Sequence, residues 1–338
     1  MNWETDRSLQ LRMLVTLGLI AALPLAFTTT LAAALNRLVF QMLAEGGEPA
    51  PRISFDPVVV VGLTVLGVGL AAVAGGRAAL SSTNARPVSA DERPELHARV
   101  DRLAATVGME PPEIAVIRSE TPNALATGGI GTDPTVAVTT GLLDALEDDQ
   151  LDAVLAHELA HLRNRDATVM SIAYLLPTLT YLVSKVTFAI LRVIGRVTGS
   201  SSSRRNGKAL LVVLATAVVT LTVSAVFWLA SNLLFRLLSQ YREHAADRGA
   251  AAITGQPLAL ADALATIDEE MQALPDRDLR ELDGGAEALY ISSIDAPMFT
   301  GEDGFIGTLA SQELFPASHP PTTERIDRLQ ELAGELER

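Results

Sequence analysis

Two histidines and a glutamate stand at the spacing that a catalytic zinc site requires. They belong to the sequence His157-Glu158-Leu159-Ala160-His161. On a helix, residues four apart share one face, so both imidazoles can bind one zinc ion while Glu158 stands beside it. Zinc lowers the pKa of a bound water, and a neighbouring carboxylate can take its proton and pass it to a leaving amine. The pattern therefore predicts metal-assisted hydrolysis.

The same pattern can also arise by chance on a solvated helix. The neighbouring residues argue against that alternative, because the motif lies between Ala156 and Leu162 in an otherwise apolar stretch. Two imidazoles without partners would be costly to bury in such a stretch. We therefore expect a metal site here.

A catalytic zinc ion commonly has three protein ligands and a water, so the two histidines leave one ligand to be found. The chain has no cysteine, so this ligand must be a carboxylate or another of its five histidines. Glu243 and Asp247 are four residues apart in a segment expected to be helical. Glu243 can bind zinc, and Asp247 can accept a hydrogen bond from a ligand imidazole. Alone, the segment would be a salt-bridged surface helix with Arg242 and Arg248, but its pairing with the first motif favours the zinc site.

These motifs resemble those of the HtpX-type membrane metalloproteases, which are gluzincins related to the CAAX prenyl proteases. The resemblance implies that Glu243 is the third zinc ligand and that Asp247 orients a histidine of the first motif. His244 is a departure from the family pattern, and a ligand role for it stays open. The residues that carry the resemblance are His157-Glu158-x-x-His161, Asn164-Arg165-Asp166, Glu243-x-x-x-Asp247, His319-Pro320 and Glu324-Arg325.

The resemblance extends to the substrate side of the site. Asn123-Ala124-x-Ala126-x-Gly128 looks like the family's strand beside the active site, which would hold a substrate backbone by edge pairing. His319 is implied to reach the active site and stabilise the oxyanion; alternatively, it is a loop histidine that caps the last helix. Arg325 either binds a substrate carboxylate or pairs with Glu324 or Asp327, and we favour the structural role.

A small sheet and several helices must position these residues. Short β-branched runs at Ile114–Ile117 and Thr135–Thr139, with Asn123–Thr127 between them, predict an antiparallel sheet of about three strands. The helix that carries the first motif opens with acidic residues at Glu147–Asp149 and continues through Arg165. Other helices are predicted over Ala90–Val107, from Phe235 to about Ile253, and near Leu258–Leu274 and Thr323–Leu336, with a long loop over Pro275–Ser318.

At 49% hydrophobic and 20% charged residues, the chain is too apolar for an ordinary soluble protein. Four stretches have no charged residue, and each is about long enough to cross a bilayer, which takes roughly 20 residues. We predict a mainly α membrane protein with about four apolar membrane helices and a zincin-like α+β catalytic domain. The four stretches are Met13–Asn36, Pro57–Gly76, Ala167–Ser184 and Ala209–Phe235.

The order of the motifs predicts a catalytic domain in two parts. Residues 1–80 would form an N-terminal transmembrane hairpin, and 81–168 the first part of the catalytic domain with the His157 motif. Residues 169–238 would form a second membrane or membrane-associated hairpin, and 239–338 the second part with Glu243 and the C-terminal helix. This second hairpin must return the chain to the same side, since the zinc site could not close otherwise.

The charge balance limits the classes of binding partner that the chain can have. The chain has 40 acidic and 26 basic residues, which argues against nucleic acid, because phosphate binding requires concentrated Lys and Arg. Most basic residues that flank the membrane runs lie on the catalytic side, which predicts a multi-pass protein of the cell membrane whose catalytic domain faces the cytoplasm. The five basic residues of Arg192–Lys208 disagree with this orientation, so either the rule is weak here or the second hairpin does not fully cross.

The sequence thus predicts a membrane zinc endopeptidase with Zn²⁺ as its cofactor and Glu158 as its general base. The resemblance implies quality control, the cleavage of misfolded or damaged membrane proteins. Two alternatives remain: a processing protease for one modified C-terminus, and a non-catalytic zinc-binding scaffold in the membrane. A scaffold would hold zinc with four protein ligands and would have no use for Glu158.

Overall fold

The computed structural model describes residues 7–40, 56, 58–67, 69–70, 85–129, 132–198, 207–273 and 320–337. This part of the chain is mainly helical, with one small sheet. The chain divides into two compact units. The first contains Met1–Leu14, Leu70–Ile172 and Arg236–Arg338, and the second contains Val15–Gly69 and Ala173–Phe235.

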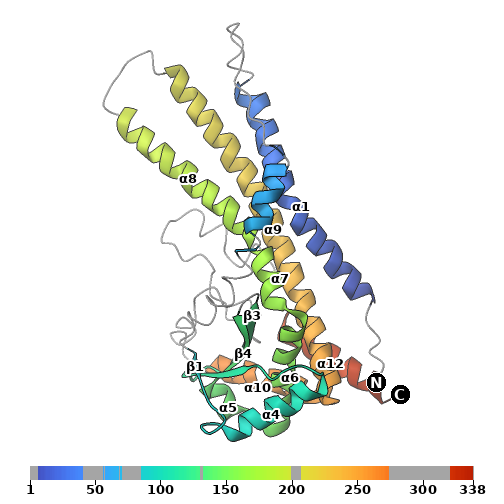
Figure 1. Cartoon of the computed structure of the whole chain (residues 1–338). Helices are drawn as coiled ribbons and strands as arrows, with labels where there is room; N and C mark the ends of the chain where they lie inside the picture. Colours follow the sequence, from blue (N-terminus) through green and yellow to red (C-terminus); the bar gives the residue numbers. More distant parts are fainter. Residues whose placement is uncertain are drawn as a thin grey trace. The chain divides into compact units, whose positions relative to one another are not determined.

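The sheet of the first unit has four strands in the order β1-β2-β4-β3 (Figure 1). β2 and β4 are parallel, while the other two pairs are antiparallel, so the prediction of a purely antiparallel sheet was wrong for one pair. The physical reason is the strand order: β3 pairs with β4 and not with β2, so β4 lies between them and runs parallel to β2. β4 contributes three fully buried residues, Val136–Val138. The strands are β1 (Arg86–Pro87), β2 (Glu113–Ile117), β3 (Ala124–Gly129) and β4 (Thr132–Thr139).

Helices pack around this sheet to form the core of the first unit. They are α4 (Pro94–Thr106), α5 (Thr140–Ala145), α6 (Asp148–Asn164), α10 (Pro257–Ala273) and α12 (Thr322–Leu336). The predicted amphipathic helix is present as α4, which begins at Pro94 because proline has no N–H to leave unpaired in a first turn. Its buried residues are Leu96, Val100, Leu103 and Ala104.

The central helix of the first unit is α6. It begins with a capping box, in which the Glu147 side chain accepts from the backbone of Gln150 and the Gln150 side chain accepts from the backbone of Glu147. All nine residues from Ala153 to His161 are buried, so this part of α6 has no solvent-facing side. This burial excludes the alternative that the His157–His161 pattern arose by chance on a solvated helix.

Within the described part of the chain, three helices are long and apolar enough to cross a membrane: Ser8–Val39, Asp166–Ile194 and Leu210–Thr254. They comprise α1 (Arg7–Leu35), the π-helix η1 (Asn36–Phe40), α7 (Asp166–Ala173), α8 (Leu175–Thr198) and α9 (Gly207–Thr254). Large apolar side chains such as Leu19, Val186 and Val218 are exposed on them, as expected for a surface in contact with lipid. The fourth predicted run is described in part, as a shorter apolar helix at Val58–Gly67. The rest of Pro57–Gly76 lies largely outside the described residues.

Candidate active site

Three buried side chains from two helices converge at one point. His157 and His161 lie on α6, and Glu243 lies on α9. The two Nε2 atoms are 3.0 Å apart, and each is 3.5 Å from an oxygen of Glu243. A tetrahedral zinc ion with bonds of 2.0–2.1 Å requires ligand atoms that are about 3.3 Å apart. The geometry of this donor set therefore suits zinc.

The close approach of α9 to α6 brings Glu243 to the histidines. Gly249 on α9 lies against Ala160 on α6, and a Cβ at position 249 would be only 2.6 Å from the Cβ of Ala160. The glycine thus lets the two backbones come closer than any larger residue would permit. Because Gly249 is less than two helical turns from Glu243, this crossing fixes where the third ligand sits.

Glu158 is fully buried beside the first histidine. Among the residues that the structure describes, neither of its carboxylate oxygens has a hydrogen-bond partner. Burial raises the pKa of Glu158 to about 8. A carboxyl group held without partners next to a metal site is free to exchange a proton with a reacting group.

A carboxylate and an arginine stand behind His157. Its Nδ1 lies 3.0 Å from Oδ1 of Asp247, so Asp247 is placed as the sequence predicts. Asp247 in turn accepts two hydrogen bonds from Arg325, from Nε at 3.0 Å and from Nη2 at 2.6 Å. The structural role expected for Arg325 is thus present, but the expected partners on its own helix were wrong. Asp247 is 78 residues away, and no local pattern reveals such a pair.

A second carboxylate and arginine stand behind His161. Its Nδ1 lies 2.6 Å from Oδ2 of Asp166, and the same oxygen lies 3.2 Å from Nε of Arg242. From the sequence, Asp166 had no assigned role and Arg242 was expected only as a surface salt-bridge partner. Arg242 is instead one of the most buried large side chains. Its position inside an apolar helix, directly before Glu243 and five residues before Asp247, was the available signal.

The carboxylates set the protonation of the two histidines. Burial alone would lower the pKa of His157, but Asp247 and Glu243 raise it to about 9. For His161, burial lowers the pKa and outweighs the opposite effect of Glu243 and Asp166. A carboxylate at each Nδ1 keeps a proton there, so Nε2 is the nitrogen that can bind a metal, in His157 after its second proton has left.

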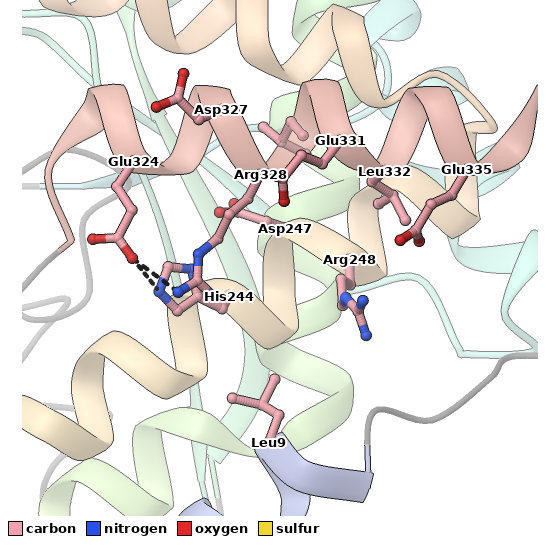
Figure 2. Close-up of a pocket in the computed structure, with 11 residues that line it drawn as sticks. Leu9, His244, Asp247, Arg248, Glu324, Asp327, Arg328, Glu331, Leu332 and Glu335 are labelled. Atoms are coloured by element: carbon pink, nitrogen blue, oxygen red, sulfur yellow. Dashed lines mark hydrogen bonds and ion pairs between the residues drawn. The ribbon is translucent and has the colours of Figure 1, made fainter.

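His244 faces a separate cavity rather than the zinc ligands. Its Nε2 lies 3.6 Å from Oε1 of Glu324, and Figure 2 shows the two side chains turned toward one another. The cavity has a volume of about 440 Å³ and is lined mainly by residues of α9 and α12. Among the described residues, the donor atoms that could hold a metal together are those of His157, His161 and Glu243, without His244.

The remaining predicted residues fall in two places. Ala124, Ala126 and Gly128 lie on β3, the strand at one end of the sheet order, and Gly128 approaches Leu162 of α6. His319 lies outside the described residues, so its oxyanion role stays a prediction.

Comparison with known proteins agrees with this geometry. Peptidase family M48 matches residues 90–333. The chain is 35% identical over 335 residues to Protease HtpX homolog 2 of Methanosarcina mazei, and the alignment covers 99% of this chain and 99% of the relative. It is 37% identical over 333 residues to Protease HtpX homolog of Moorella thermoacetica, covering 98% of this chain and 97% of the relative. The crystal structure of S. mikatae Ste24p is similar with a TM-score of 0.48 and 19% identity, covering 94% of this chain and 67% of that one.

The family match covers both zinc motifs and most of the chain, and the HtpX relatives align along nearly its whole length. The three donor atoms that these motifs supply form the zinc site of a metallopeptidase. The chain therefore belongs to peptidase family M48, among its HtpX-type metalloproteases.

Proposed function

We propose that this metallopeptidase is an endopeptidase of the cell membrane that cleaves misfolded or damaged membrane proteins from its cytoplasmic side. The observation that carries the hydrolytic part is the buried zinc site with Glu158 beside it, whose carboxylate has no hydrogen-bond partner among the described residues. Apolar helices long enough to cross a bilayer support a substrate that is itself in the membrane. The predicted domain boundaries and the cytoplasmic orientation are part of this proposal.

Each group at the site has a defined task in this reaction. Zinc, when bound to His157, His161 and Glu243, supplies a Lewis acid that polarises the scissile carbonyl and acidifies water. Glu158 takes the proton of the attacking water and delivers it to the amine nitrogen as the peptide bond breaks. Asp247 holds His157 in the orientation that the metal requires.

The sheet offers a place for the substrate backbone. In the order β1-β2-β4-β3, β3 pairs with β4 on one side only among the described strands. An extended peptide can add to such an edge through main-chain hydrogen bonds, which are independent of sequence. This mode suits an enzyme that accepts many unfolded chains, in contrast to a processing protease for one modified C-terminus.

The test is cleavage of an unfolded protein by the full chain purified in detergent, with bound zinc measured in the same samples. We expect the wild type and Glu158→Gln to hold about one zinc ion each. Cleavage by Glu158→Gln should fall about 10²–10⁴-fold, the usual contribution of a general base. Glu110→Gln, the same change at an exposed position, is the matched control and should cleave normally.

Two outcomes would overturn the proposal. Normal cleavage by Glu158→Gln would show that another group is the base. Zinc in both proteins without cleavage by either would instead favour a narrowly specific processing enzyme or a zinc-binding scaffold.

A further inference from the structure

Both nitrogens of His161 have a defined neighbour. Its Nε2 faces the other two zinc ligands, at 3.0 Å from His157 and 3.5 Å from Glu243. Its Nδ1 lies 2.6 Å from Oδ2 of Asp166, which is only 2% exposed. Since a carboxylate can only accept, the proton of the ring must be on Nδ1 and the lone pair on Nε2. Asp166 therefore selects the tautomer of His161 that can bind zinc.

Arg242 places a cation beside Asp166. A buried carboxylate without a cation is costly, and the Arg242 guanidinium supplies one at 3.2 Å. Arg242 Nη2 also lies 3.4 Å from Nδ1 of His161. When Asp166 accepts a hydrogen bond from Nδ1 of His161, this nitrogen and Nη2 of Arg242 both carry protons. Their contact is therefore a packing contact that positions the imidazole, and not a hydrogen bond. Arg242 thus acts on the zinc ligand through Asp166.

The backbone is shaped to make this contact. In an uninterrupted helix, position 166 would lie about 140° around the axis from His161 and could not face it. α6 instead ends at Asn164, and Arg165 adopts a left-handed conformation with φ 56° and ψ 39°. This conformation is unfavourable for a residue with a side chain. The turn brings Asp166, the first residue of α7, back to His161.

We propose that Asp166 and Arg242 are positioning residues that fix His161 for zinc, as Asp247 and Arg325 do for His157. The two arrangements have the same order of groups: each histidine has a carboxylate near Nδ1, and each carboxylate has a buried arginine behind it. The pair also ties the metal site to the start of α7 and to α9, the helices that lead into two of the candidate spans. This inference rests on the proposed peptidase function.

The test measures metal binding separately from cleavage, in the full chain in detergent. Zinc affinity is obtained by competition with a chelator, and the visible spectrum of the Co²⁺-loaded protein reports the ligand geometry. Asp166→Ala should lower zinc affinity about 10–100-fold and alter the Co²⁺ spectrum, with a smaller loss for Asp166→Asn, which keeps an acceptor oxygen. Arg242→Lys should retain more affinity than Arg242→Met, because lysine keeps the charge but not the fork of donors.

Asp152→Asn is the matched control, since Asp152 lies on the same helix and pairs with Arg99 and Arg102 away from the metal. It should leave zinc affinity and the Co²⁺ spectrum unchanged. Unchanged affinity and spectrum in Asp166→Ala would overturn the inference, as would an effect of Asp152→Asn as large as that of Asp166→Asn. If the wild type binds zinc in an Asp166-dependent way but cleaves nothing, the proposed function fails and this inference stands.

Discussion

Besides the two histidines, six acidic or basic side chains meet at the zinc site with almost no access to water. The acids are Glu158, Asp166, Glu243 and Asp247, and the cations are Arg242 and Arg325. A bound Zn²⁺ would bring the positive charge to four and balance these acids, with neutral histidines as ligands. Metal binding and the stability of this core should therefore depend on one another.

Removing the charge of Arg325 should destabilise the protein strongly. Arg325→Met leaves Asp247 buried without its cation, and breaking such a pair costs about 3–5 kcal/mol. Arg328→Met is the control, because Arg328 pairs with Glu324 at the surface and such pairs contribute about 0–1 kcal/mol. Chemical unfolding in detergent, with zinc loading held equal, measures both. Similar losses in the two variants would contradict the assignment of Arg325 as a buried partner of Asp247.

At the residue scale, local spacing was enough to predict the two histidine ligands, which share a helical face. The absence of cysteine left a carboxylate or another histidine as the third ligand, and the family resemblance pointed to Glu243. Spacing was not enough for Asp166 and Arg242. Asp166 reaches His161 only because Arg165 breaks the helix, and Arg242 reaches Asp166 only through packing between α6, α7 and α9. Such contacts depend on tertiary structure, which a local pattern does not contain.

The crossing of α6 and α9 at Gly249 leads to a prediction about a helix pair. Gly249→Ala places a Cβ 2.6 Å from that of Ala160, and neither atom can move without its backbone. We expect the helices to separate, with a loss of zinc affinity and a destabilisation of about 1–3 kcal/mol. Chelator competition and thermal unfolding measure the two effects. Adding Ala160→Gly should restore much of both, because it returns the missing space.

Gly334→Ala is the control for this change. Gly334 lies within α12, and a Cβ there meets nothing within 4 Å. Alanine should stabilise this helix by up to about 1 kcal/mol through its higher helix propensity. If Gly249→Ala behaved like Gly334→Ala, close backbone approach would not be what positions Glu243.

The turn after α6 allows a test by glycine substitution. Arg165 has positive φ, so Arg165→Gly should be neutral or stabilise the protein by up to about 1 kcal/mol, since glycine adopts this conformation without strain. Arg163→Gly, within the last turn of α6, should cost about 1 kcal/mol. The changes in unfolding temperature of the two variants should therefore differ in sign or clearly in size. A larger loss for Arg165→Gly would mean that its side chain, and not the turn, matters at this position.

Helices were easier to predict than strands for reasons that individual elements make clear. α4 and α6 show their apolar spacing and acidic or proline starts within one short window. β1 has two residues, too few for any periodicity. The parallel pairing of β2 with β4 follows from the order in which the strands assemble, with β4 between β2 and β3. Strand order was therefore beyond what the local sequence could reveal.

At the scale of the whole chain, the catalytic unit is discontinuous. Its zinc ligands come from segments on either side of Ala173–Phe235, which belong to the second unit. The segment between them contains α8 and most of α9, which are long enough to enter a bilayer. The site can close only if the chain enters and leaves the membrane on one side, so membrane topology and catalysis are coupled.

The lack of cysteine makes this topology directly testable. Single cysteines at Ala105, Ala44 and Ser202 can be probed in intact cells with a maleimide that does not cross membranes. Ala105 is exposed on α4, so if the catalytic unit is cytoplasmic, Ala105→Cys should react only after the cells are opened. Ala44→Cys, in the predicted loop of the first hairpin, should react in intact cells and serves as the positive control.

Ser202→Cys decides between the two interpretations of the basic segment Arg192–Lys208. Labelling in intact cells means that the second hairpin crosses fully and places its basic residues outside, against the usual charge rule. Labelling only after the cells are opened means that the hairpin enters the membrane and returns without crossing, so that these basic residues stay inside with the catalytic unit. The labelling result of a variant is interpreted only if that variant retains cleavage activity. Labelling of Ala105→Cys in intact cells would reverse the proposed orientation and would direct the search for substrates to the outer face of the membrane.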